Sequence, residues 1–431
     1  MRKMKDSGIP WIGEIPADWS IVKIKAGVHK VGSGKTPSGG ATSYTDEGVL
    51  FLRSQNVYDT GLELSNPTYI TPEVDEEMKG TRVFPNDVLL NITGGSIGRC
   101  CIFPETLETA NVNQHVSIIR VNKNVFLPEF MHYYWISPLG SMAISLYQTG
   151  GNREGMSAEA IKNTPIILMP LVEQKLICKV LDAKCAEIDA VLDKTRTSIE
   201  EYKKLKQAII TQAVTKGIRG DRPMKESGVI WLDAVPAEWT ISKIKYTIFP
   251  KEKPVLPMDE VITCFRDGIV TLRRNRREEG FTISFTENGY QGVDVGDLVI
   301  HGMDTFAGAI GCSDSRGKTS PVVHVCSTVG NNRYFMYFLR YMAYSGVLMD
   351  FSNGVRIRSS DFRNFKKLAV FEMLVPPLRE QNKIVDYLDS TLAKIDQVIK
   401  QKEILISELE ACKKSAIYEY VTGKKEVPNA Y

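Results

Sequence analysis

The chain has 431 residues, of which 43% are hydrophobic and 24% are charged, and its formal net charge is +3. This is the composition of an ordinary folded protein, and it excludes a mainly disordered or fibrous chain. No apolar run approaches the ~18–20 residues that cross a bilayer, and no apolar stretch follows the basic start as it would in a secretory signal. The eight cysteines include no CxxC pair, so we expect a reduced, cytoplasmic protein without a zinc site.

The chain is an internal duplication. Residues 4–25 and 224–245 are identical at 12 of 22 positions, and residues 170–189 and 377–396 are identical at 10 of 20. Each copy has a mixed segment followed by a long helical segment. We therefore predict globular domains at 1–169 and 218–376, helical spacers at 170–217 and 377–426, and a short tail at 427–431.

The two globular segments have the patterning of α+β domains. Short β-branched runs at 116–121 and 297–301 predict strands, and aromatic-rich runs at 130–136 and 334–344 predict buried helices. His115 and His324 lie 209 residues apart, which makes them candidates for equivalent positions. A structural role for this pair is favoured, with ligand contact as the alternative.

The two spacer segments contain no Gly or Pro from 171 to 216 and from 378 to 422. Their core-type residues recur at alternating steps of four and three, which is the period of a coiled coil. One helix cannot bury such a stripe alone, so we predict that the two helices pair antiparallel, with Leu181 near Leu409. Two unconnected surface helices are the alternative. The predicted seam consists of Leu181, Ile188, Leu192, Ile199 and Tyr202 in the first helix, and of Leu388, Leu392, Ile395, Ile399, Ile406 and Leu409 in the second.

The sequence contains no motif that indicates catalysis. Residues 32–36 (GSGKT) resemble part of a phosphate-binding loop, but His29 stands where that pattern requires glycine, and Pro37 interrupts the helix that should follow. Lys35 stays a candidate for contact with a DNA phosphate. Residues 66–68 (NPT) lack the N/D-P-P-Y/F pattern that grips a flipped base. The residues therefore give no indication of a cofactor or metal site on this chain.

Side chains suited to nucleic-acid contact occur in both globular segments. Adjacent arginines in the second segment repel one another unless an anion lies beside them, which favours phosphate contact, with a solvated surface as the alternative. Amide and guanidinium groups in the first segment can read base edges, although an ordinary surface role is equally consistent with each. The candidates are Lys35, Arg53, Gln55, Asn56, Arg99, Asn113, Gln114 and Arg153 in the first segment, and Arg266, Arg273, Arg274, Arg276, Arg277, Arg356 and Arg358 in the second.

Five motifs follow one another along the chain. They are an opening motif at 7–19 that recurs at 227–239, the run 35–38 (KTPS), the run 86–90 (NDVLL) followed by 96–98, the tripeptide 113–115 (NQH), and Pro-Leu-x-Glu-Gln at the start of each long helix. In this order they resemble the specificity subunit of Type I restriction–modification systems over nearly the whole chain. The second half departs from the pattern, because it lacks a clear Thr-Pro-Ser element and the Asn-Gln pair before His324.

The resemblance implies two target recognition domains on an antiparallel pair of helical spacers. Each domain would read one half of a bipartite, asymmetric target in double-stranded DNA. The chain would direct two methyltransferase subunits and two motor–nuclease subunits to that target. The resemblance implies that this chain is not an enzyme, in agreement with its lack of catalytic motifs, and binds no cofactor or metal itself. It assigns catalysis to these partners, together with S-adenosylmethionine, ATP and Mg²⁺. A coiled-coil scaffold, or a DNA-binding adaptor outside restriction, is the alternative function.

Overall fold

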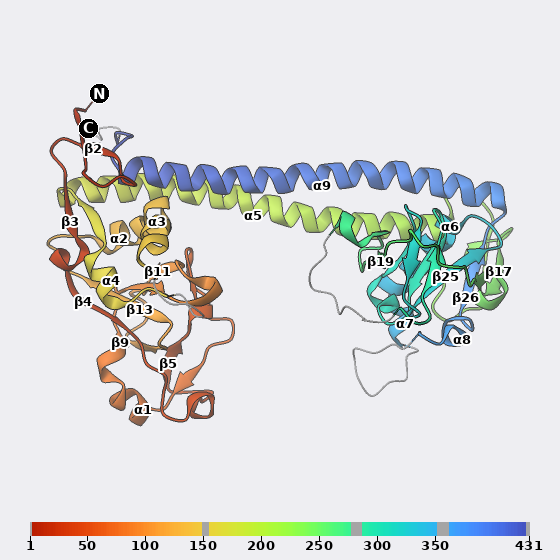
Figure 1. Ribbon diagram of the computed structural model, residues 1–431, viewed down its shortest axis with the longest axis horizontal. Coiled ribbons are helices and arrows are strands. Elements are labelled where there is room, and N and C mark those ends of the chain that lie inside the picture. The colour runs from red at the N-terminus through yellow and green to blue at the C-terminus, as the bar shows by residue number, and fades with distance from the viewer. Residues whose placement is uncertain (1, 149–154, 277–286, 351–361, 428–431) are drawn as a thin grey trace. The chain divides into compact units, whose positions relative to one another are not determined.

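The computed structural model describes residues 2–148, 155–276, 287–350 and 362–427. The chain divides into two compact units (Figure 1): unit 1 consists of Met1–Thr195 and Ile404–Tyr431, and unit 2 consists of Arg196–Glu403. Both units combine helices and strands, in agreement with the predicted α+β class. No helix in the described ranges contains an apolar stretch sufficient to span a bilayer. Four candidates lie outside the described residues: Arg153, Arg277, Arg356 and Arg358.

Unit 1 is built on two four-stranded sheets. Its strands are β1 (Met4–Asp6), β2 (Glu14–Pro16), β3 (Ser20–Lys23), β4 (Val28–Ser33), β5 (Val49–Leu52), β6 (Val57–Tyr58), β7 (Gly61–Leu62), β8 (Tyr69–Ile70), β9 (Arg82–Val83), β10 (Val88–Asn91), β11 (Cys100–Ile102), β12 (Ala110–Val112), β13 (Val116–Val121) and β14 (Pro165–Leu168), and its short helices are α1 (Pro72–Glu77), α2 (Pro128–Ile136), α3 (Pro138–Tyr147) and α4 (Ala158–Asn163). The sheets have the orders β11-β10-β13-β4 and β8-β5-β12-β9. Val88 and Leu90 pack in the core that contains α2, whereas Leu89 and Ile118 pack in the core that contains the second sheet. The central strands are therefore apolar on both faces.

Unit 2 repeats the first of these sheets. Its strands are β15 (Met224–Lys225), β16 (Val235–Pro236), β17 (Thr240–Lys243), β18 (Ile248–Pro250), β19 (Ile262–Cys264), β20 (Val270–Leu272), β21 (Gln291–Val293), β22 (Leu298–His301), β23 (Ile310–Cys312), β24 (Gly317–Thr319), β25 (Val323–Thr328) and β26 (Glu372–Val375), and its short helices are α6 (Asn332–Tyr344), α7 (Val347–Asp350) and α8 (Phe365–Leu368). The strand order β23-β22-β25-β18 matches that of the first sheet in unit 1 strand for strand. The predicted strand at 297–301 and the predicted helix at 334–344 correspond to β22 and α6.

The two histidines that were expected at equivalent positions occupy different ones. β13 begins at Val116 and β25 begins at Val323, and each of these residues pairs with the last residue of the neighbouring central strand, β10 or β22. His115 precedes its strand, whereas His324 is the second residue of its strand. The expected equivalence was wrong because the two copies are offset by 207 residues at this strand, and not by 209.

The long helices α5 (Leu171–Lys216) and α9 (Leu378–Val421) each contribute a part to both units. Within each unit the two parts lie side by side (Figure 1). The predicted seam residues divide by exposure. Those that are buried are Leu181, Leu192, Ile199, Leu388, Leu392, Ile395 and Ile399, and those that are partly exposed are Ile188, Tyr202, Ile406 and Leu409.

Two ion pairs define the pairing of the helices. In unit 1, Lys413 Nζ donates to Asp189 Oδ1 and Oδ2, each at 2.7 Å. In unit 2, Lys206 is paired with Asp396. The residues of one pair lie 207 positions from their counterparts in the other, so both copies use the same antiparallel register.

The register predicted from the apolar stripe was wrong. With Leu181 near Leu409, Asp189 would face α9 about 12 residues before its observed partner, Lys413. Since apolar residues recur every three to four positions along both helices, such a shift brings one stripe back against the other. The apolar pattern therefore predicts that the helices pair, and charged residues select the register.

Each long helix begins with a carboxylate that joins it to the opening motif. The carboxylate accepts one hydrogen bond from a tryptophan indole and two from an arginine, and the arginine also stacks on that tryptophan. These triads are Arg2, Trp19 and Glu173 in unit 1, and Arg222, Trp239 and Glu380 in unit 2. The repeated sequence motifs are therefore contacts that dock each long helix on its own unit.

The glutamine that follows this carboxylate is also buried in both copies. Gln174 Oε1 accepts a hydrogen bond from Leu127 N (2.9 Å), directly before α2. Gln381 Oε1 accepts one from Asn331 N (2.9 Å), directly before α6. The Pro-Leu-x-Glu-Gln motif thus positions the aromatic-rich helix of each unit against the start of a long helix.

Candidate functional site

In unit 1 the candidate residues lie on loops that leave neighbouring strands. β5 and β12 are parallel, so the loops after Leu52 and Val112 emerge at the same edge of the sheet. Asn113 N donates a hydrogen bond to Leu52 O at 3.0 Å, which holds the two loops together. Arg53 directly follows Leu52, and its Nη2 donates to Thr68 Oγ1 at 2.8 Å. The sheet edge therefore brings Arg53 and Asn113 close together in the fold.

The candidates beside Arg53 differ in their surroundings. Asn56 is only 5% exposed, and its Oδ1 accepts a hydrogen bond from Arg53 N at 2.9 Å, so it shapes the loop. Gln55, one position earlier, is exposed. The Arg99 guanidinium lies over the Tyr58 ring, 4.4 Å from its centre. Asn56 therefore stabilises its own loop, whereas contact of Gln55 and Arg99 with a ligand stays a prediction.

Both polar atoms of the Gln114 side-chain amide have a partner in the protein. The Thr36 hydroxyl is hydrogen-bonded to Gln114 Oε1, and Gln114 Nε2 lies 3.1 Å from His115 Nε2. His115 Nδ1 in turn lies 2.6 Å from Thr93 Oγ1. A side-chain amide has two donor hydrogens and two acceptor lone pairs, so these contacts leave Gln114 one donor and one acceptor. That combination matches the major-groove edge of adenine.

The glycine-rich run before this site is a closely packed loop. Lys35 N donates to Val112 O at 3.1 Å. A Cβ atom at Gly34 would lie 2.0 Å from the same carbonyl oxygen, so only glycine fits there. The close packing of this backbone against Val112 places Thr36 beside Gln114 and leaves the Lys35 side chain exposed. The run therefore positions a polar network, which the sequence did not indicate.

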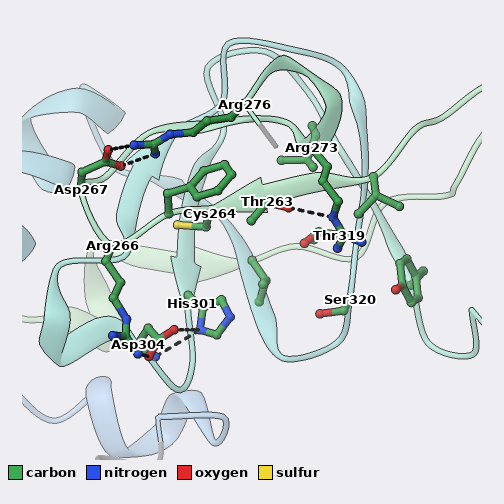
Figure 2. Close-up of a pocket in the computed structure, with 15 residues that line it drawn as sticks. Thr263, Cys264, Arg266, Asp267, Arg273, Arg276, His301, Asp304, Thr319 and Ser320 are labelled. Atoms are coloured by element: carbon green, nitrogen blue, oxygen red, sulfur yellow. Dashed lines mark hydrogen bonds and ion pairs between the residues drawn. The ribbon is translucent and has the colours of Figure 1, made fainter. Parts of the chain in front are cut away.

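In unit 2 a cavity of about 790 Å³ lies beside β19 and β22. β24 corresponds to β12, and its Lys318 forms a parallel bridge with Val261, directly before β19. β19 therefore takes the place of β5, and Arg273, which follows β20, is not the counterpart of Arg53. The cavity walls include Thr263, Cys264, Arg273, His301, Thr319 and Ser320 (Figure 2).

Three of the predicted arginines of unit 2 are paired with carboxylates. The pairs are Arg266 with Asp304 (2.9 Å), Arg274 with Glu260 (2.9 Å) and Arg276 with Asp267 (2.9 Å from Nη1 to Oδ1). The hydrogen bonds to Asp267 raise the pKa of Arg276, which also lies over Phe265. Carboxylates of the protein thus supply the negative charge that phosphate was expected to supply. Phosphate contact by these arginines stays a prediction.

Two polar side chains project into the cavity from its opposite sides. Arg273 Nε donates to Thr263 Oγ1 at 3.3 Å. His301, which sequence analysis did not select, is the last residue of β22, and its Nδ1 accepts a hydrogen bond from Asp304 N at 3.1 Å (Figure 2). Burial lowers the pKa of His301. Only its place at the end of a predicted strand pointed to it in the sequence.

The connection that carries the Asn-Gln pair in unit 1 is also present in unit 2. β12 leads to β13 through Asn113, Gln114 and His115, and β24 leads to β25 through 320–322 (SPV). The same connection is therefore present in both units, with different side chains.

Among the described residues, no group of three His, Cys, Asp or Glu side chains is arranged to hold a metal ion.

Comparisons with known proteins agree over most of the chain. Residues 16–201 match the family model of the Type I restriction modification DNA specificity domain. The chain is 22% identical, over 96% of both sequences, to a relative from Methanocaldococcus jannaschii named the putative type I restriction enzyme MjaX specificity subunit. It is 26% identical to the type I restriction enzyme EcoBI specificity subunit of Escherichia coli over 42% of this chain and 39% of that one. A solved chain from work on complex assembly and conformational transition of the type I R-M system aligns over 95% of this chain and 99% of its own, with a TM-score of 0.68 and 15% identity, and therefore shares the fold.

Proposed function

We propose that this chain, which belongs to the specificity subunits of Type I restriction–modification systems, recognises a bipartite, asymmetric target in double-stranded DNA. Each unit would read one half of the target. The observation that carries the proposal is that one backbone frame presents different polar side chains in its two copies. Gln114 stands on the connection before β13, and Ser320 stands on the same connection before β25. Equivalent frames with unlike side chains suit unlike half-sites.

The chemistry of these side chains favours recognition of base edges. Amides read adenine through paired donor and acceptor groups, and guanidinium groups read guanine through paired donors. Contacts to phosphate position a protein on the duplex without selecting sequence. We assign these two tasks to the candidates together: Lys35, Arg53, Gln55, Arg99, Asn113 and Gln114 in unit 1, and Arg266, Arg273, Arg274 and Arg276 in unit 2.

The chain acts as the non-catalytic member of its complex, because family membership assigns catalysis to partner subunits. Two methyltransferase subunits would bind S-adenosylmethionine, and two motor–nuclease subunits would bind ATP and Mg²⁺. The division into recognition domains at 1–169 and 218–376 and spacers at 170–217 and 377–426 belongs to the same proposal. A pure scaffold is the weaker alternative, since it gives no reason for polar side chains to differ on a repeated frame.

The direct test is to co-express the full chain with a methyltransferase subunit of a Type I system from the same organism and to map methylated bases across the host genome. We expect methylation at one asymmetric sequence made of two short halves around an unread gap. Methylation without a bipartite pattern, or equal binding of the purified complex to duplexes with and without the mapped sequence, would contradict the proposal.

A further inference from the structure

His301 is held in one tautomer by the backbone. Asp304 N donates to His301 Nδ1 at 3.1 Å, so this nitrogen acts as an acceptor and the ring hydrogen is on Nε2. The Asp304 carboxylate lies 3.9 Å from the same nitrogen. Figure 2 shows the ring with Nδ1 toward Asp304 and its other nitrogen turned away, into the cavity. The imidazole therefore presents a single N–H donor to whatever enters.

The surrounding groups give the cavity the character of a site for a neutral, planar ligand edge. Arg266 and Arg276, at the exposed rim of the cavity, are each paired with a carboxylate of the protein, which partly offsets their positive charge. The facing wall carries the Arg273 guanidinium and the hydroxyl groups of Thr263 and Ser320 (Figure 2). His301, Arg273, Thr263 and Ser320 thus line one space of about 790 Å³, which is large enough for a base edge.

The equivalent position in unit 1 is closed. Asn91 ends β10 and pairs with the first residue of β13, as His301 ends β22 and pairs with the first residue of β25. Asn91 is fully buried, and its Nδ2 donates to Ser54 O (2.8 Å) and Ser96 Oγ (3.2 Å). His301 is 23% exposed at its side chain. The same point of the fold is thus used for packing in one unit and opens into a cavity in the other.

We infer that His301 determines specificity in unit 2 by donating its Nε2–H to the acceptor edge of a guanine, with Arg273 as the second donor. In the major groove, guanine offers the two acceptors N7 and O6, whereas adenine combines one acceptor with a donor. Donors supplied by His301 and Arg273 together would therefore select guanine over adenine. This inference rests on the proposed function of the chain, and it predicts a guanine in the half-site that unit 2 reads.

The first test compares target selection by the full chain in complex with its methyltransferase, using a duplex library randomised in both half-sites. We expect His301→Leu to lose about three- to tenfold of the preference for guanine at one position of one half-site, the effect of one neutral hydrogen bond. The other half-site should be unchanged. His301→Gln, which retains an N–H donor, should keep most of the preference.

His324→Leu is the matched control. His324 lies on the adjacent strand, and its Nε2 is hydrogen-bonded to Phe362 O at 2.8 Å, with its ring against Phe365. This variant removes a histidine from the same sheet without removing a donor from the cavity. We expect it to lower stability and to leave the selected sequence unchanged. A change of the same base preference by His324→Leu would overturn the assignment.

The second test changes the DNA and leaves the protein intact. In labelled duplexes, the guanine is replaced by 7-deazaguanine, which lacks the N7 acceptor, or by 2-aminopurine, which lacks the O6 acceptor. We expect at least one analogue to weaken binding of the wild-type complex about three- to tenfold and to have no further effect on His301→Leu. If neither analogue weakens wild-type binding, or if the half-site contains no guanine, the role of His301 is refuted while the proposed function stands. If the wild-type complex selects no sequence, the proposed function itself fails.

Discussion

The carboxylate at the start of α9 gives the sharpest prediction about stability. The substitution Glu380→Gln keeps the side-chain shape and an acceptor for Trp239 Nε1, but it removes the negative charge beside Arg222. The Arg222 and Glu380 side chains are only 6% and 7% exposed. Removal of one partner from a buried ion pair costs about 3–5 kcal/mol. Because Arg222 also contacts Glu238, which is half exposed, we expect the lower end of this range, about 3 kcal/mol.

Unit 1 contains the matched control, Glu173→Gln. Glu173 makes the same contacts with Arg2 and Trp19, but Arg2 and Glu173 are each 29% exposed at the side chain. Water screens this pair, and Arg2 keeps a second partner in Asp18, so we expect a cost of about 1 kcal/mol. The chemistry of the two substitutions is identical. The difference of about 2 kcal/mol therefore reports burial alone.

Local hydrogen exchange is the appropriate assay, because a chain with two compact units does not unfold in one two-state step. We expect Glu380→Gln to reduce amide protection about 100-fold around residues 222–239 and to leave residues 2–19 unchanged. Equal losses of amide protection for Glu380→Gln and Glu173→Gln, each in its own segment, would refute the reasoning.

Burial, the largest single effect, would raise the pKa of Glu380, but the hydrogen bonds from Arg222 and Trp239 and the positive charge of Arg222 together hold the pKa below its usual value. A depressed pKa stabilises the folded state above the unfolded pKa of about 4.3. The difference in stability between wild type and Glu380→Gln should therefore persist at pH 7 and disappear as the pH falls below about 4.

Three further predictions concern the long helices. Lys413→Asp should destabilise the part of the α5–α9 helix pair that lies in unit 1. Adding Asp189→Lys should restore most of the lost stability, as measured by a double-mutant cycle. A failure of the second change to restore stability would contradict the observed register. Insertion of seven residues after Thr195, with a matching insertion in α9, lengthens each helix by about 10.5 Å and should widen the unread gap of the methylated target by about three base pairs; an unchanged gap with full activity would show that the helices do not set spacing. Residues 1–217 alone should form an antiparallel homodimer in which Asp189 of each copy pairs with Lys206 of the other, because Lys206 is the counterpart of the observed partner. That fragment should direct methylation to a palindrome; Lys206→Glu should abolish the dimer in sedimentation, and a soluble monomer without this change would disprove the interchange of halves.

The fold was predictable where one local pattern determines one element. Uninterrupted helical periodicity predicted spacers at 170–217 and 377–426, and the helices span Leu171–Lys216 and Leu378–Val421. The repeated opening motif predicted a duplication, and the two central sheets have the same strand order. The register of the helices was not predictable in this way. The register depends on the ion pair between Lys413 and Asp189, which lie 224 positions apart in the sequence. An apolar stripe that repeats every few residues is compatible with several registers and does not select the one that forms this pair.

The sequence identified side chains whose chemistry suits DNA contact, but it did not show which of them the fold leaves available for a ligand. Asn56 has the amide of a base reader, but it is buried against its own loop, which only the fold determines. Arg276 stands among arginines that suggested phosphate, but Asp267, nine positions earlier, already binds it. In both cases the partner is a group of the protein that becomes adjacent only when the chain turns back. Composition therefore overestimates the number of side chains that remain for a ligand.

The most informative difference lies in the second unit, where the family pattern is weakest. The second unit has no Asn-Gln pair before His324, and its connection to β25 contains Ser320 and Pro321 instead. Motifs of this kind describe the frame, since the Lys35 backbone N–H donates to Val112 O and Gln381 docks the start of α6 on α9. A residue that reads a variable target has no reason to belong to such a motif. His301 fits this logic, because its surroundings are set by the backbone of Asp304 and the end of β22. The residues that distinguish one half-site from another are therefore to be sought at equivalent positions of the frame where the side chains differ.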